Sequence, residues 1–158
     1  MKTKVKEIAE AYALLDKAKT DKMARADRAA LMKAMHAMKR VATDFEEFRR
    51  DVLTRLRPEK AEEYAATLAE FDAMTVEQRK EAVGEAKYAE ALLANAEFEQ
   101  TVSESLEDEA AREVELTAPL TEEAFCVLME SNPDWTLGQA MRVQQVLCET
   151  DNSEKSDN

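Results

Sequence analysis

The feature that most constrains this fold is a row of apolar residues whose spacing alternates between three and four positions. Its members are Leu31, Ala34, Met38, Val41, Phe45, Phe48 and Val52. Only Arg55 interrupts the row before Leu56 closes it. Alternating steps of three and four residues place side chains on one face of an α-helix. This heptad row therefore predicts a long amphipathic helix that other helices cover on one side.

The composition extends the helical prediction to the whole chain. Its 158 residues include only two Gly and three Pro, and few breakers among many Ala, Glu, Lys and Leu residues favour long helices over sheets. No apolar run approaches the ~20 residues that cross a bilayer. The N-terminal residues lack the apolar core of an export signal. We therefore expect a cytoplasmic protein in which Cys126 and Cys148 remain thiols.

These patterns predict an all-α fold, an elongated helical bundle or antiparallel coiled coil over residues 1–108. Its helices are expected at about 4–19, 22–57, 59–73 and 76–108. A capping-box pattern at 43–46 could start a new helix, but the heptad row passes through Thr43 without slipping. We therefore expect one continuous or gently kinked helix over 22–57. A second capping box, Thr75 to Gln78, marks the start of the fourth helix.

The fourth predicted helix carries two apolar faces. One is a seam that includes Tyr88, Phe98 and Leu106, with Asn95 lying within it. A polar residue in a seam can fix helix register, and the ordinary alternative is an Asn at a partly wet edge. The second face is rich in alanine: Ala82, Ala86, Ala89, Leu93 and Ala96. Small side chains allow close helix approach, so this helix is expected to be contacted on two sides.

The remaining residues divide into three segments. Residues 109–119 are expected to form an acidic linker, although 113–116 alternate polar and apolar residues and could form a short strand. A helical hairpin follows over 120–149, with Thr121 and Thr136 as N-terminal caps and a turn at 131–134. The last residues, 150–158, contain no hydrophobe and are expected to be disordered.

The charge is distributed unevenly along the chain. Residues 1–58 carry 15 Lys and Arg against 9 Asp and Glu, a net charge of +6, whereas residues 59–158 carry 7 against 25, or −18. The ordinary interpretation is that the two halves attract each other, within one molecule or between two. The overall charge of −12 argues against nonspecific binding of nucleic acid, since phosphates repel an acidic protein.

We expect no catalytic residue, cofactor or metal ion. The single histidine, His36, is predicted on the exposed side of its helix, and no nucleophile or glycine-rich loop accompanies it. Met32, Met35, His36 and Met38 form the one cluster with ligands suited to Cu(I). Methionines beside an apolar seam are ordinarily core residues, so packing is the preferred interpretation.

The sequence thus favours a non-enzymatic interaction or assembly protein that self-associates or holds a protein partner, similar in type to small phage or mobile-element scaffolds and chaperones. The candidate partner surface comprises Met35, Met38, Phe45, Phe48, Val52, Trp135, Leu137 and Met141. One alternative is an acidic regulator or inhibitor that occupies a basic surface in the manner of a nucleic-acid mimic. Another is a binder of an anionic polymer through the basic helix at 22–57.

Overall fold

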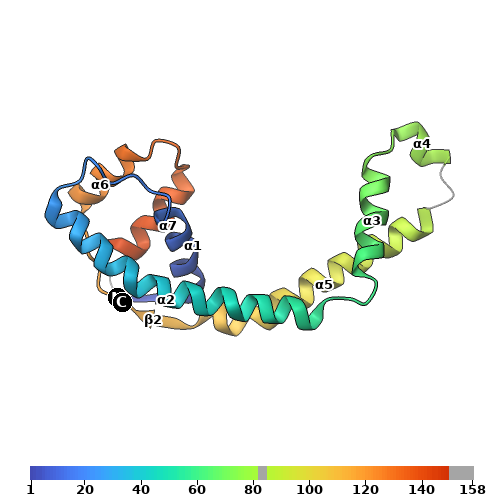
Figure 1. The fold of residues 1–158 in the computed structure, drawn as a ribbon, viewed down its shortest axis with the longest axis horizontal. Coiled ribbons are helices and arrows are strands. Elements are labelled where there is room, and N and C mark those ends of the chain that lie inside the picture. The colour runs from blue at the N-terminus through green and yellow to red at the C-terminus, as the bar shows by residue number, and fades with distance from the viewer. Residues whose placement is uncertain (82–84, 150–158) are drawn as a thin grey trace, which may run out of the picture. The chain divides into compact units, whose positions relative to one another are not determined.

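The structure, a computed structural model, describes residues 1–81 and 85–149 and is almost entirely helical within them (Figure 1). The helices are α1 (Val5–Leu15), α2 (Arg25–Leu56), α3 (Ala61–Asp72), α4 (Val76–Glu81), α5 (Glu85–Ala111), α6 (Glu122–Ser131) and α7 (Leu137–Leu147). The strands are β1 (Lys2–Lys4) and β2 (Glu113–Glu115). The predicted all-α class with a C-terminal helical hairpin is confirmed.

The helix limits follow local signals in the sequence. Helix α2 runs through Thr43 without interruption, because the heptad row keeps its register there. The helix expected over 76–108 corresponds to α4 and α5, and the residues between them, 82–84, lie outside the described chain. The tail expected to be disordered, 150–158, also lies outside it.

The preference for a linker at 109–119 was wrong at its centre, where β2 pairs with a strand. Its antiparallel partner is β1, with Lys2 opposite Glu115 and Lys4 opposite Glu113. Opposite charges facing each other across two strands stabilise the pair. Residues 2–4 carry no strand signal of their own, because they have the pattern of the approach to a helix. This register places basic residues of the N-terminal half opposite acidic residues of the C-terminal half.

Thr3, at the centre of β1, is buried, and its hydroxyl has no hydrogen-bond partner. A buried hydroxyl without a partner costs free energy. Thr3→Val keeps the branched shape and removes that group, so we expect the free energy of unfolding to rise by about 1 kcal/mol. Urea unfolding followed by Trp135 fluorescence measures the change. The exposed Thr117→Val is the control, and equal shifts in the two variants would contradict the prediction.

The chain divides into two compact units. Unit 1 comprises Met1–Glu47 and Asp108–Asn158, and unit 2 comprises Phe48–Glu107. This grouping differs from the division expected from the sequence, because the hairpin shares one core with α1 and the first part of α2. That core consists of Ile8, Ala11, Leu15, Met23, Leu31, Met38, Leu120, Ala124, Phe125, Leu128, Ala140, Val143, Val146, Leu147 and Cys148.

Unit 2 contains the end of α2, helices α3 and α4, and most of α5. Phe71 of α3 stacks on Tyr88 of α5 with ring centroids 4.2 Å apart and an interplanar angle of 11°. The Arg79 guanidinium donates to the carbonyl of Phe71 at 3.0 Å, which ties α4 to the end of α3. Asn95 is exposed and donates to Glu99 within the same helix, which favours the ordinary interpretation of a wet edge.

Candidate interaction surface

Unit 1 contains an open cleft of about 950 Å³ between α1 and the hairpin. Its walls carry charges of both signs and one large aromatic side chain. The lining residues that matter below are Glu10, Lys17, Lys19, Asn132, Trp135, Gly138 and Arg142. Both chain segments are needed to form it, because α1 and the hairpin are distant in the sequence and adjacent only in the fold.

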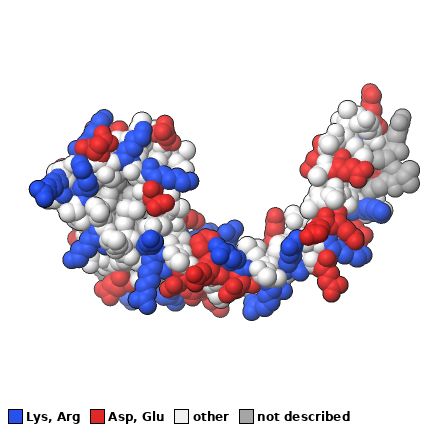
Figure 2. All heavy atoms as spheres, viewed as in Figure 1, with Lys and Arg blue, Asp and Glu red and all other residues white. Residues whose placement is uncertain are grey.

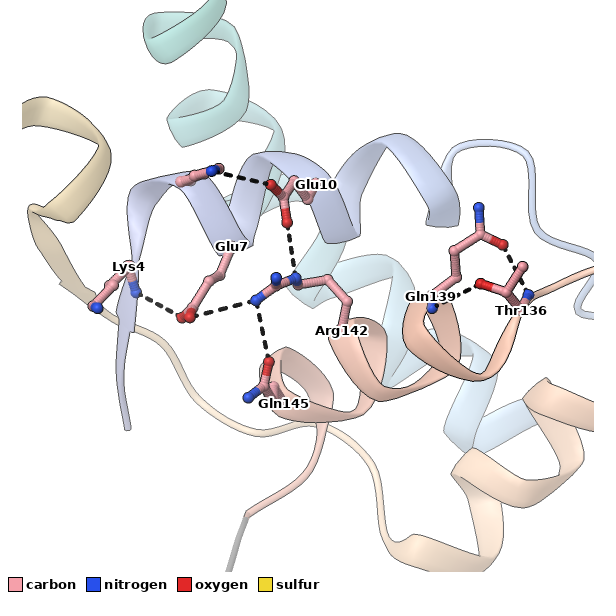
Figure 3. Close-up of polar contacts among 8 residues, drawn as sticks. Lys4, Glu7, Glu10, Thr136, Gln139, Arg142 and Gln145 are labelled. Atoms are coloured by element: carbon pink, nitrogen blue, oxygen red, sulfur yellow. Dashed lines mark hydrogen bonds and ion pairs between the residues drawn. The ribbon is translucent and has the colours of Figure 1, made fainter. Parts of the chain in front are cut away.

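Arg142 connects the two sides of this cleft (Figure 3). Its Nε lies 2.8 Å from Glu10 Oε2, and its Nη1 lies 3.5 Å from Glu7 Oε1, both on α1. The same nitrogen donates to Gln145 Oε1 at 3.3 Å within α7. These groups are partly exposed, so each ion pair contributes about 0.2–1 kcal/mol. Their main effect is to align α7 against α1, whose apolar faces supply most of the packing energy.

Asn132 fixes the base of the cleft. Its Nδ2 donates to the carbonyl oxygens of Leu128 at 2.8 Å and Lys19 at 3.0 Å, while its Oδ1 accepts the Lys19 N–H at 2.8 Å. One buried side chain therefore satisfies three backbone groups. Two of them belong to the loop after α1, and the third to the last turn of α6. The hairpin turn is thereby held against the end of α1.

Local capping sets where each arm of the hairpin begins. Thr136 Oγ1 accepts the Gln139 N–H at 3.2 Å, and Gln139 Oε1 accepts the Thr136 N–H at 2.9 Å (Figure 3). Thr121 Oγ1 accepts the N–H of Ala124. The predicted caps at Thr121 and Thr136 are confirmed, as is the capping box at Thr75. Helix α7 starts at Leu137, and residues 137 and 141 both fall on its outer side, which faces away from the core of unit 1.

Two apolar side chains stand out on that outer side. Leu137 is 77% exposed and Met141 is 56% exposed. The opposite side of the same helix is completely covered, with Ala140, Val143 and Leu147 in the core of unit 1. Residues four apart on a helix are neighbours, so the two side chains form one stripe. We call Leu137 and Met141 the hairpin stripe.

The structure separates the predicted partner residues into buried, half-buried and exposed groups. Met38, Phe45 and Val52 are 1%, 7% and 1% exposed, so they pack inside the chain. Met35 and Trp135 are half-buried, and Trp135 lines the cleft. Phe48 of unit 2 is 40% exposed. The most accessible of the predicted partner residues are therefore Leu137 and Met141 of the hairpin stripe. Neither belongs to the heptad row of α2.

Sequence reasoning missed the cleft itself and several exposed apolar residues. Lys19 and Asn132 are 113 positions apart, so no local pattern could join them. The exposed residues that were not predicted as partner surface are Met32, Val76, Leu92, Leu93 and Met129. Leu93 did carry a signal, since it belongs to the alanine-rich face of its helix.

The part of the chain that the structure describes contains no metal cluster and no membrane-spanning helix. His36 is exposed, as expected from its position opposite the heptad row. No group of three or more His, Cys, Asp or Glu side chains there is arranged to hold a metal ion. None of the helices in that part of the chain combines the length and apolar character needed to cross a membrane.

The two cysteines differ in their surroundings. Cys126 is exposed, whereas Cys148 is buried in the core of unit 1. Burial and, to a smaller extent, the negative charge of Glu122 together raise the pKa of the Cys148 thiol to about 11. A thiol with a raised pKa contains little of the reactive thiolate at neutral pH.

We therefore expect a maleimide to label the native protein once, at Cys126, and to label the urea-unfolded protein twice. Peptide mass spectrometry identifies the modified residue. The Cys126→Ser variant should incorporate no label over the period in which the wild type reacts completely. Rapid labelling of Cys148 in that folded variant would contradict the burial that the structure gives it.

Comparison of the chain with protein-family models, curated proteins and solved structures finds no match in sequence or fold.

Proposed function

We propose that the protein is a non-enzymatic helical interaction or assembly protein that holds a protein partner at the hairpin stripe. The exposure of Leu137 and Met141 on one side of α7 is the observation that carries this proposal. Single exposed apolar residues are common, but adjacent ones cost solvation free energy that a partner would recover. Methionine also adapts its shape to different apolar surfaces.

The surroundings of the stripe support a docking role. The cleft between α1 and the hairpin borders the same helix through Gly138 and Arg142. Trp135 forms an aromatic wall of this cleft, and tryptophan side chains often anchor protein interfaces. Lys17 and Lys19 line the same cleft and offer positive charge. An apolar helix or peptide with acidic residues beside its apolar positions would match this combination of groups.

The rigidity of the support also favours binding. The stripe lies on a helix that a capping box starts and a buried face holds in place. A preformed surface loses little conformational entropy when a partner docks. The proposal assigns no reaction to the stripe or to the cleft.

Site-specific photo-crosslinking in the cell that makes the protein tests this proposal. A photoreactive residue at position 141 should capture a discrete partner, whereas one at Val76, also exposed at 67%, should not. Leu137→Asn should abolish the capture from position 141, while unchanged Trp135 fluorescence and circular dichroism show that the variant is folded. Equal capture from positions 76 and 141 would contradict the proposal, as would capture that survives Leu137→Asn.

A further inference from the structure

Helix α5 is covered on one side only within the described chain. Along that side Ala91 and Val102 are buried, and Tyr88, Phe98 and Leu106 are half-buried. The alanine-rich face predicted to meet a second neighbour is instead open to solvent. Its described members, all exposed, are Ala86, Ala89, Leu93 and Ala96, with Leu93 at 61%.

The open face of α5 is strongly acidic beyond Leu93. Residues 88–111 contain no Lys or Arg. Glu97, Glu104 and Glu107 continue the open face at helical spacing, and all three are exposed. In the view of Figure 2, Asp and Glu side chains gather around α3 and the neighbouring part of α5, with Lys and Arg side chains among them. We call this surface, from Ala86 to Glu107, the acidic face of α5.

The first half of α2 carries a complementary surface. Residues 28–43 contain no Asp or Glu. Met32, which is 57% exposed, Lys33, His36 and Arg40 all lie on the side of α2 opposite its buried residues. No ion pair joins Lys33 or Arg40 to another residue of the described chain. We call this surface the basic face of α2.

Within each face the apolar part precedes the charged part along the chain. On α2, Met32 lies about two turns before Lys39 and Arg40, and on α5, Leu93 lies before Glu97 and Glu104. Met32 and Arg40 are ~12 Å apart along the helix axis. The same distance along the axis of α5, measured from Leu93, reaches the segment between Glu97 and Glu104. A parallel pair of helices therefore matches apolar residues with apolar residues and opposite charges with each other.

We propose that the basic face of α2 in one copy of this chain docks in parallel on the acidic face of α5 in a second copy. The small alanines would let the helices approach closely, with Met32 against Ala89 and Leu93. The contact is heterologous, because two different faces meet. Each copy offers both faces, so the contact either closes into a pair or ring or continues from copy to copy. This inference uses residues outside the hairpin stripe.

Reciprocal charge reversal tests the pairing. Sedimentation of the wild type at low salt should show a mass that rises with concentration and falls when salt is added. Lys33→Glu with Arg40→Glu, and separately Glu97→Lys with Glu104→Lys, should each weaken self-association at least about tenfold. An equimolar mixture of the two double variants should associate again, because each reversed face then meets a complementary one.

Two further measurements make the test specific. Arg55→Glu with Lys60→Glu changes the net charge by the same amount as the α2 variant but lies outside both faces, so it should reduce association less. Carbodiimide treatment of a mixture of normal and isotope-labelled chains should link Lys39 of one copy to Glu97 or Glu104 of another. Links only within single chains would overturn the proposal.

Several outcomes would contradict the inference. A wild type that stays monomeric at every concentration and salt overturns it, and so does a variant mixture that fails to associate. Retention on heparin without self-association would indicate an anionic polymer as the occupant of α2. The Leu137→Asn variant should self-associate like the wild type, so failure of the hairpin-stripe proposal and failure of this one are distinguishable.

Discussion

Replacing Leu128 with alanine is expected to lower the free energy of unfolding of unit 1 by about 3–4 kcal/mol. Leu128 is 0% exposed and lies on α6 within the core that α1, α2 and the hairpin share. Truncation removes buried apolar surface and leaves a cavity that packed helices cannot fully close. Urea titration followed by fluorescence measures the loss, because the only tryptophan, Trp135, belongs to unit 1.

The matched control is Leu137→Ala in the same unit. The same atoms are removed from a side chain that is 77% exposed, so the change should stay within about 0.5 kcal/mol. If both variants lost the same stability, the assignment of Leu128 to the inside and Leu137 to the outside of the hairpin would be wrong. The comparison therefore also tests the orientation on which the hairpin stripe depends.

Replacing Asn132 with alanine is expected to cost about 3 kcal/mol, although few apolar atoms are lost. Its amide forms three hydrogen bonds with the backbone of Lys19 and Leu128. Without it, the partly buried N–H and carbonyl of Lys19 and the buried carbonyl of Leu128 each lose a partner. Such a loss costs about 1–3 kcal/mol where water cannot reach the group and less where it can. The loop after α1 should also detach from the hairpin turn, which widens the cleft beside Trp135.

Asn95→Ala is the control for this loss, because Asn95 is exposed and its side chain donates to Glu99 of the same helix. Alanine also has the higher helix propensity, so the stability of α5 should hold or rise slightly. Amide hydrogen exchange offers a second readout, since the Lys19 N–H should exchange faster only in the Asn132 variant. Unchanged exchange at Lys19 would contradict the hydrogen bond described here.

Interaction through two separate surfaces would suit an assembly protein. The hairpin stripe and the paired faces of α2 and α5 share no residue, so partner binding and self-association could occur together. Two such sites on one chain bring bound partners into proximity through self-association alone. The proposed experiments vary the two surfaces separately and therefore show whether either acts without the other.

The sequence alone determined most of the local structure of this protein. Helix positions, the caps at Thr75, Thr121 and Thr136, and the continuity of α2 through Thr43 all depend on residues three or four positions apart. Such interactions act within one or two turns, so their pattern is visible in the chain. The exposed position of His36 was predictable for the same reason, because helical periodicity relates each residue to the opposite face.

Only the tertiary structure decided which neighbour covers each apolar face. Met38 and Phe45 on α2 are covered, whereas Leu137 and Met141, which are equally apolar, are left open. Periodicity identifies the apolar face of a helix but not the segment that packs on that face. The hydrophobic effect is non-directional, so any apolar surface can cover the face. The β1–β2 pair and the Asn132–Lys19 contact likewise join segments more than a hundred residues apart, where no local signal reaches.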